Sequence, residues 1–527
     1  MFIGAMLPTI VYSQSADTTY LQEVKVYGIP FTSFATGSTI ETIASDSTIE
    51  TLGDRLFDNT TLYLKTYGHG QLTTIAMRGS TASQTAVLWN GININSPTLG
   101  QTDFSLLPLF LVDEVSVRYG SSSALYGSDA IGGSILLGQA APRFTKYTQV
   151  SALQQLGSFG RMSTGLKLNA GSDRWEFRTK FTHMQLNNNF RYYSPANGFE
   201  KVQEHAGVTN YGVDQQIFYK ISSRQQLSLE GMLTHNFREV QPAVTNNDGD
   251  ETMHDDHLRL CLNYIVDSNI GVISATTAYI NNNQTYDDGG KVSTVQSTQL
   301  TAQFHIDQMI NMRSSFRYGG NFNHFTAVSQ HYAAGLNENR FDVFTSYRLA
   351  VLPQMLVSLD LRQAFYNRSN APFTPSVGFD WTIKDGAIHK VTWRALAGSG
   401  FRIPTLNDRY WQPGGNPDIQ AEQSLNIESG ARWSVIHDRV NISVDVTAFK
   451  NWMTDMIVWL ESAHAGVWAP SNLQQVHVHG SEIRGAWQQQ VYKTKLRFNI
   501  AYSYVKSINQ KGLNEHDDAT CLLYTSD

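Results

Sequence analysis

The chain has 527 residues, a mean hydropathy of −0.28 and only 16% charged residues. It is too long for one ordinary domain, so at least two units are expected. Its formal net charge of −6 offers no basic surface for nucleic acid, and no apolar run approaches the roughly 18 residues of a transmembrane helix. Asn, Gln, Ser, Thr, Gly and Tyr supply the polarity. That mix is typical of a transmembrane β-barrel, whose strands turn an apolar face to lipid and a polar face to the lumen.

The first 16 residues are apolar and end in the small or polar residues Ser13–Ala16. They resemble the apolar region and cleavage site of a secretory signal, although no Lys or Arg precedes them. We interpret residues 1–16 as a partial signal peptide and expect the start of the chain to be cut short. A disordered mature N-terminus is the alternative.

The remainder divides into two units with different patterns. Residues 17–140 combine short apolar segments, many glycine turns and a helix-like stretch at Asp54–Leu64. In residues 141–527, apolar and polar residues alternate, as in 175–181 and 440–448. Successive side chains of a strand point to opposite faces, so each run predicts a strand with one apolar and one polar face.

The connections between these predicted strands alternate in length. Short turns are expected at Gly171–Asp173, Ser222–Arg224, Lys384–Gly386 and His437–Asp438. Long polar loops are expected near 187–210, 241–256, 281–293, 328–339, 406–423 and 461–475. This alternation is typical of a membrane barrel. We count about 17 strands, and because bacterial single-chain barrels close with an even number, we expect the barrel to be incomplete at its C-terminal end.

Several short motifs follow one another in a fixed order. The first unit contains Met77–Gly79, Val87–Gly91, Val115–Gly120 and Leu125–Gly133. The second unit contains Phe401–Asn407, Gly415–Asp418 and Ala421-Glu422. As an ordered set these motifs resemble those of TonB-dependent outer-membrane receptors, and the second set is especially close to the cobalamin and siderophore branch. The resemblance covers about residues 20–505.

The resemblance implies a mostly β fold. An α+β plug at residues 31–140 would fill the lumen of a transmembrane antiparallel β-barrel at 141–527, which has twenty-two strands in the family. It also implies active import of a scarce solute across the outer membrane of a Gram-negative bacterium. The expected partners are the periplasmic TonB protein, outer-membrane lipid and a small-molecule ligand. Family members are not enzymes, and no nucleophile–base set stands out in the chain.

Residues 17–30 hold the expected coupling segment. In the family a short segment before the plug, the TonB box, pairs as an added strand with TonB through main-chain hydrogen bonds. The residues that resemble it are Leu21, Gln22, Glu23, Val24, Lys25 and Val26. The alternative is that this β-prone run is the first strand of the plug itself.

Arg78 and Arg118 are the informative charges of the plug motifs. In the family, arginines at these motifs pair with carboxylates of the barrel wall, and a guanidinium can make two parallel bonds to one carboxylate. Glu422 and Glu428 are the candidate partners, so these four residues form the expected plug–barrel latch. The alternative is that both arginines are satisfied within the plug.

Two short plug segments are the candidate ligand site. Gly70–Thr74 resembles the apex segment of cobalamin receptors, in which the residues matching Leu72 and Thr73 touch ligand, and Thr98 and Leu99 belong to a second apex loop. Neither segment carries a cation, which favours cobalamin over the anionic ferric chelates of siderophore receptors. Alternatively, both segments are ordinary surface turns.

An acidic stretch supplies a metal candidate. Asp248, Asp250, Asp255 and Asp256 offer hard oxygen ligands that suit calcium, as in the loops of cobalamin receptors, although their spacing does not match an EF-hand. The alternative is a solvated acidic loop. No other cofactor is expected.

Two further classes compete with energised import. A passive porin or a surface adhesin would use the barrel alone and leave residues 21–26 without a coupling role. A signalling transducer would need an extra folded domain before that segment, and only about twenty residues precede it. Within the import class, a ferric siderophore is the alternative ligand to cobalamin.

Overall fold

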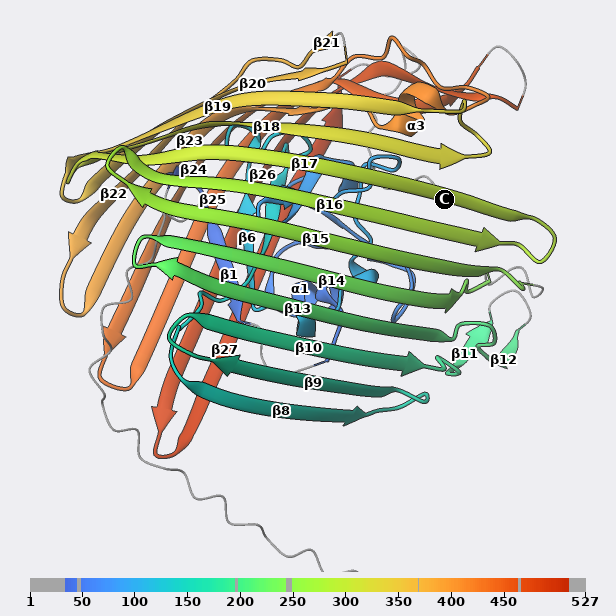
Figure 1. Cartoon of the computed structure of the whole chain (residues 1–527), viewed down its shortest axis with the longest axis horizontal. Coiled ribbons are helices and arrows are strands. Elements are labelled where there is room, and N and C mark those ends of the chain that lie inside the picture. The colour runs from blue at the N-terminus through green and yellow to red at the C-terminus, as the bar shows by residue number, and fades with distance from the viewer. Residues whose placement is uncertain are drawn as a thin grey trace, which may run out of the picture.

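The computed structural model describes residues 34–44, 49–194, 198–242, 249–367, 369–462 and 466–510. Within these ranges an N-terminal α+β unit, the plug, lies inside a large antiparallel barrel (Figure 1). The mostly β architecture predicted from the alternation is therefore confirmed. None of the helices in these ranges is long and apolar enough to span a membrane.

The plug is built around a five-stranded sheet in the order β1-β6-β7-β4-β5, so β1 and β5 form its opposite edges. β4 pairs in parallel with β7, and the other neighbours are antiparallel. Leu56 of the first helix is buried together with Val117 and Ile135 of the sheet, which forms the plug core. The plug elements are β1 (Ile40–Ala44), α1 (Leu52–Asn59), β2 (Tyr63–Thr66), β3 (Thr73–Ala76), η2 (Ala82–Gln84), β4 (Thr85–Trp89), β5 (Ile92–Asn93), η3 (Phe104–Leu106), η4 (Leu109–Leu111), β6 (Glu114–Tyr119), α2 (Ser123–Tyr126) and β7 (Gly133–Gly138).

Helix α1 begins and ends earlier than the predicted Asp54–Leu64. Thr51 caps it: the Thr51 hydroxyl accepts from the backbone N–H of Asp54, and the Asp54 carboxylate accepts from the backbone N–H of Thr51. This reciprocal capping box fixes the start of the helix. Beyond Asn59 the chain turns into β2, where Leu64 pairs with Ile75 of β3. The second half of the predicted helix is therefore one strand of a hairpin.

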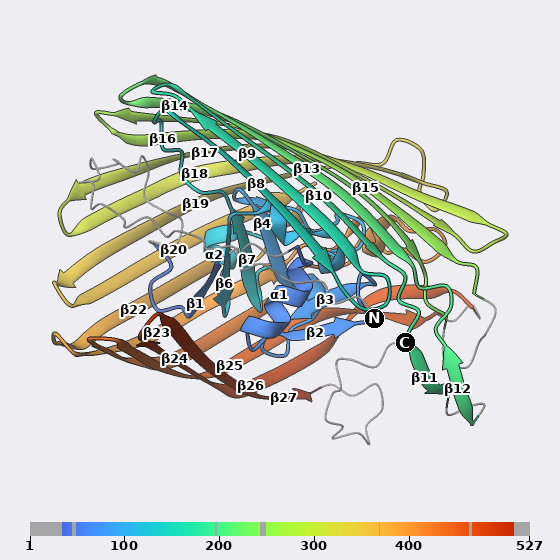
Figure 2. The same ribbon diagram turned by 90° about the horizontal axis from the view of Figure 1, so that it is seen from below.

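Among the described residues the barrel runs through eighteen strands, of which β21 has only two residues. Neighbouring strands are antiparallel, and β11 pairs with β12 in a separate hairpin beside the barrel (Figure 2). The elements are β8 (Tyr147–Leu156), β9 (Met162–Gly171), β10 (Trp175–Leu186), β11 (Arg191–Ser194), β12 (Phe199–Val202), β13 (Val208–Ser222), β14 (Gln225–Glu239), β15 (Thr252–Ser268), β16 (Gly271–Asp287), β17 (Val292–Asn311), β18 (Ser314–Ser329), β19 (Asn337–Leu352), β20 (Met355–Tyr366), β21 (Ser369–Asn370), β22 (Thr374–Asp385), β23 (His389–Arg402), α3 (Leu406–Tyr410), β24 (Glu422–His437), β25 (Val440–Glu461), β26 (Trp468–Val491) and β27 (Thr494–Asn509).

Several strands extend into segments that the sequence predicts as loops. β16 continues to Asp287 and β17 begins at Val292, so the connection predicted at 281–293 is much shorter. β25 and β26 have 22 and 24 residues, whereas a tilted strand crosses a bilayer in about 9–11. The polar residues in these extensions satisfy their backbone groups in the strand ladder rather than in a loop.

The alternating pattern places polar side chains inside the barrel. Along β10, Trp175 and Phe177 are exposed on the outer surface, whereas Glu176, Arg178 and Lys180 are buried in the lumen. The apolar faces therefore point outward, the reverse of a water-soluble sheet protein. Plug and wall meet through polar and charged side chains, and this interface holds the candidate sites.

Candidate ligand site and plug–barrel contacts

The first candidate ligand segment is the tip of the β2–β3 hairpin. The tip contacts the wall at the end of the barrel that carries the longer loops. Gln71 Nε2 donates to the Glu239 carbonyl at 2.9 Å, and Asn188 Nδ2 donates to the His69 carbonyl at 2.9 Å. Leu72 is half-buried. Thr73 is buried, and its hydroxyl bonds Thr66 and the Gln71 carbonyl, so its polar atoms are already used within the plug.

The second segment lies against the wall segment that carries α3. The Leu406 N–H donates to the Pro97 carbonyl at 2.9 Å. Thr98 is buried and shares a 2.8 Å hydrogen bond with Ser96, whereas the Leu99 side chain is 49% exposed. Of this predicted pair, Leu99 therefore presents the accessible side chain.

The two segments are connected through Asp103. One Asp103 oxygen accepts from the Thr73 N–H at 3.0 Å, and the other accepts from Arg238 of β14 at 2.7 Å. Asp103 also lines a cavity with Thr98 and Leu99, which we call the outer cavity. It encloses about 630 Å³ of empty space, and its wall residues are Asp255, His257, Arg259, Asn282, Gln284, Val295 and Ser297.

Arg78 joins the plug to two carboxylates of the wall. It forms an ion pair with Glu428 of β24 and contacts Glu482 of β26 through Nε at 3.2 Å and Nη2 at 2.9 Å. Burial by itself would lower the pKa of the Arg78 guanidinium, but the charges of Glu428 and Glu482 raise it above its ordinary value. The guanidinium therefore stays charged in a buried site.

Two motif glycines shape this contact. Gly79 has φ +73° and follows Arg78 in a tight turn. A Cβ on Gly120, which has φ +80°, would lie 2.5 Å from an oxygen of Glu428. Only glycine leaves room there for the carboxylate that binds Arg78.

The structure corrects two of the expected latch partners. Arg118 donates to Ser38 of the plug at 2.9 and 2.8 Å rather than to Glu422 or Glu428. Glu422 pairs with Arg402 of the wall at 2.7 Å and accepts a 2.7 Å bond from the neutral plug residue Gln84. Arg118 lies on β6, inside the sheet, so its strand neighbours determine its partner.

Sequence reasoning missed the other ionic contacts between plug and wall. Glu41 of β1 pairs with Arg484 at 2.6 Å, Asp113 with Lys180 at 2.8 Å, and Asp103 with Arg238 at 2.7 Å. Each wall partner lies on the inward, polar face of its strand, which the alternation predicts. The alternation does not predict how far along the barrel axis an inward residue lies, so it does not predict which plug residue that side chain contacts.

The predicted calcium ligands do not gather within the described ranges. Asp255 and Asp256 are successive residues of β15 and point to opposite faces: Asp255 is buried near Arg238, and Asp256 is exposed beside His235. No three His, Cys, Asp or Glu side chains form a metal-binding group in the part of the chain that the structure describes. Asp248 lies outside the described residues, as does the 21–26 segment.

Comparisons with known proteins agree with this architecture. The family model "TonB-dependent Receptor Plug Domain" matches residues 35–134, and "TonB dependent receptor-like, beta-barrel" matches residues 118–520. A vitamin B12 transporter, BtuB, of Vibrio vulnificus is 25% identical over 445 residues, which are 81% of this chain and 68% of the transporter.

Solved structures extend the likeness in fold. The copper transporter OprC superposes with a TM-score of 0.72 at 15% identity, covering 89% of this chain and 80% of OprC. The siderophore receptor PirA of Acinetobacter baumannii gives 0.68 at 16% identity, covering 90% of this chain and 84% of the receptor. Because the family models match most of the chain, this protein belongs to the TonB-dependent receptors, the transporters of the Gram-negative outer membrane.

Proposed function

We propose that the protein imports cobalamin across the outer membrane. The observation that carries this proposal is the sequence match to a vitamin B12 transporter over 81% of the chain. Cobalamin would bind at the extracellular mouth, with Leu99 and the hairpin tip around Leu72 as plug contacts.

The chemistry of the outer cavity supports this cargo. Its amide side chains, Gln101, Asn282 and Gln284, can donate and accept hydrogen bonds with a large amide-bearing ligand. The carboxylates Asp103 and Asp255 line the same cavity. Arg238 pairs with both of them, and Arg259 lines the cavity too, so the amides and not a net charge support the neutral cargo.

A ferric siderophore is the alternative cargo, and the fold shared with the siderophore receptor PirA favours including it in the test. Equilibrium binding of the purified protein to cyanocobalamin and ferric enterobactin separates the two. We expect tight binding of cyanocobalamin only. Tight binding of ferric enterobactin without binding of cyanocobalamin would overturn the proposal.

Leu99→Ala tests the plug contact. Losing a contact that buries most of this side chain is expected to weaken cyanocobalamin binding about tenfold, which corresponds to roughly 1.4 kcal/mol. Leu156→Ala is the matched control, since Leu156 is 78% exposed at the end of β8, in the wall. Equal affinity of the two variants would remove Leu99 from the site.

We further propose that residues 21–26 bind TonB as an added strand. Deleting them is expected to abolish cyanocobalamin uptake by cells while binding to the purified protein stays unchanged. Cells without TonB, carrying the undeleted chain, should match the deletion. Uptake that persists in both would instead indicate a passive porin.

Calcium binding by the stretch around Asp248 and Asp250 stays a prediction. If calcium binds there, a chelator should weaken cyanocobalamin binding. The double change Asp248→Ala with Asp250→Ala should then remove the effect of the chelator. Equal affinity with and without chelator would contradict it.

A further inference from the structure

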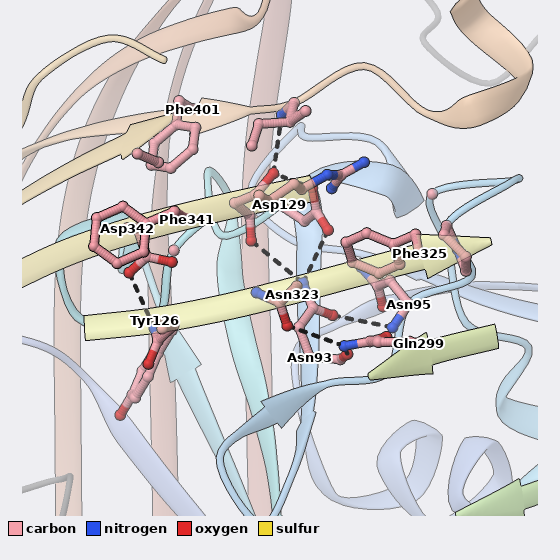
Figure 3. A pocket seen from close by; sticks show the side chains of 18 of the residues that line it. Asn93, Asn95, Tyr126, Asp129, Gln299, Asn323, Phe325, Phe341, Asp342 and Phe401 are labelled. Carbon is pink, nitrogen blue, oxygen red and sulfur yellow. Dashed lines mark hydrogen bonds between the residues drawn. The ribbon is translucent and has the colours of Figure 1, made fainter. Parts of the chain in front are cut away.

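Two more cavities lie between the plug and the wall. The middle cavity encloses about 780 Å³ between plug residues 91–100 and 126–129 and a wall that includes β17, β18 and β19 (Figure 3). The inner cavity encloses about 1280 Å³ between the β4, β6 and β7 strands of the plug and strands β13–β16.

The three cavities adjoin one another in series. The outer and middle cavities share Ser96, and the middle and inner cavities share Gly91 and Tyr126. Three plug residues therefore line two cavities each, and one of them, Gly91, has no side chain.

The series runs from the extracellular to the periplasmic end of the barrel. Asp255 and Gln284 of the outer cavity lie near the ends of β15 and β16 that lead to longer connections. Gln226 and Ser228 of the inner cavity follow the short turn between β13 and β14 directly. Long loops are extracellular and short turns periplasmic in such barrels.

At β5 itself the plug is held by uncharged hydrogen bonds, whereas beside it two carboxylates join plug and wall: Asp103 pairs with Arg238 of β14 at 2.7 Å, and Asn90 donates to Glu230 of β14 at 2.7 Å. Gln299 Nε2 of β17 donates to the Asn93 carbonyl at 3.3 Å, and Gln303 Nε2 donates to the Gly91 carbonyl at 3.2 Å. Figure 3 shows Gln299 and Asn93 side by side at the middle cavity. Neutral contacts of this kind contribute little net free energy each, so β5 itself is attached to the wall less firmly than the plug edge that carries Arg78.

We propose that the cargo crosses the barrel through these three cavities, between the β5 edge of the plug and strands β13–β19 of the wall. This proposal rests on the proposed import function and names the route. TonB-dependent force would widen the two narrow points, at Ser96 and at Gly91 with Tyr126, while the β1 edge stays attached to the wall.

The lining predicts which cargo passes. Six carboxylates line the series against two guanidiniums: Asp103, Glu114, Asp129, Glu230, Asp255 and Asp342 against Arg259 and Arg340. Neutral amides occupy much of the remaining polar surface, including Asn93, Asn95, Gln299, Asn321 and Asn323. Three of these carboxylates are themselves paired, Asp103 and Asp255 with Arg238 and Asp342 with Arg362. A neutral solute rich in amide and hydroxyl groups suits this lining.

Covalent tethers on the two sides of the plug test the route. In a chain with Cys261→Ser and Cys521→Ser, the first variant carries Asn93→Cys with Gln299→Cys and joins β5 to β17. The matched variant carries Thr39→Cys with Thr447→Cys and joins the residue before β1 to β25, because the two hydroxyls are 3.4 Å apart. A short bifunctional thiol reagent closes each tether, and uptake of radiolabelled cyanocobalamin by cells is measured.

Closing the β5 tether is expected to lower uptake at least tenfold relative to the same variant without reagent. Closing the β25 tether should leave uptake within about twofold. Equal block by both tethers would mean that the whole plug moves out, and block by the β25 tether alone, or by neither, would place the route elsewhere. Each of these results overturns the proposal.

The cargo is checked independently, so that the two proposals can fail separately. Before tethering, the parent chain is assayed for uptake of cyanocobalamin, ferric enterobactin and copper. If it takes up one of the others instead of cyanocobalamin, the proposed function fails, and the tether comparison is made with that solute.

Discussion

The two edges of the plug sheet are attached to the barrel in different ways. On the β1 side, Glu41, Arg78, Glu428, Glu482 and Arg484 form a buried ion cluster around Tyr119, over whose ring both guanidiniums lie. On the β5 side, the carbonyls of Asn93 and Gly91 accept from neutral glutamines, and cavities adjoin the contacts.

This difference explains how the plug can stay anchored to the barrel wall at one edge and still separate from it at the other. A buried ion pair contributes little by comparison with a well-packed apolar contact, but breaking it by removing one partner is costly because a charge remains buried. The ion cluster therefore resists partial displacement of the β1 edge. The β5 strand loses neutral hydrogen bonds when it separates, and water or cargo in the cavities can replace them, although Asp103–Arg238 and the bond from Asn90 to Glu230 must also break on this side.

Arg78→Met is the most severe test of this comparison. It leaves Glu428 buried without its cation, so we expect the free energy of plug opening to fall by about 3–5 kcal/mol. Hydrogen exchange of the Val115–Tyr119 amides in detergent-solubilised protein measures it. Adding Glu428→Gln and Glu482→Gln should recover part of the loss, because the uncompensated charges are then removed. A loss below about 1 kcal/mol for Arg78→Met would show that the cluster does not anchor the plug.

Gly120→Ala tests whether the anchoring depends on space for Glu428. The added methyl group would displace the carboxylate, and we expect a loss of about 1–3 kcal/mol by the same exchange measurement. Gly127→Ala is the control, since Gly127 also has positive φ but its added Cβ would meet only an Arg362 nitrogen at 3.8 Å. Glu428→Asp should rescue Gly120→Ala by shortening the side chain. A larger loss for Gly127→Ala would assign the effect to backbone strain.

The sequence predicts the chemistry of the ion cluster better than its geometry. Met77–Gly79 resembles a family motif, and the structure places Arg78 against Glu428. The partner Glu482 was missed because it lies on β26, and strand alternation gives the inward direction of a residue but not its height along the barrel. Arg118 was assigned to the wall by its motif alone, whereas its place inside the sheet directs it to Ser38.

The sequence patterns predicted the secondary structure only in part, for the same reason. Alternation identified the strands, but it placed loops where polar residues continue the ladder, as at the end of β25. The predicted helix ran past Asn59 because Leu64 fits a helical pattern as well as a strand, and only its pairing with Ile75 decides between them. The cavities could not be predicted, since they depend on which plug edge faces which part of the wall.

Gln299→Leu sharpens the comparison from the β5 side. The variant removes the donor to the Asn93 carbonyl, and we expect plug opening to become easier by about 0.5–1.5 kcal/mol, well below the effect of Arg78→Met. Exchange of the Val87–Trp89 amides, next to this edge, measures it. An effect equal to that of Arg78→Met would show that both edges anchor the plug alike.

The ion pair between His69 at the hairpin tip and Asp54 is the weakest of these contacts, and the charge of His69 makes it sensitive to pH. His69 Nδ1 lies 3.5 Å from Asp54 Oδ1 of α1. The hydrogen bond with Asp54 raises the pKa of His69 above its ordinary 6.5. Burial alone would raise the pKa of Asp54, but its bonds to His69 and Thr51 lower it. A cationic group whose pKa is raised by folding stabilises the folded state at pH values below its ordinary pKa. That contribution is lost as the pH rises through the raised pKa.

The tip contact should therefore weaken between pH 6 and pH 8. The His69 side chain is 71% exposed, so water screens the pair and the opening equilibrium of the Tyr67–Leu72 amides should change only about two- to threefold. Hydrogen exchange at the two pH values, corrected for the intrinsic rates, measures this change, and His69→Gln should abolish it. A His69→Gln variant that keeps the full pH dependence would show that another group controls the tip. If the change is found, the outer end of the plug is held in part by a charge that titrates near neutral pH.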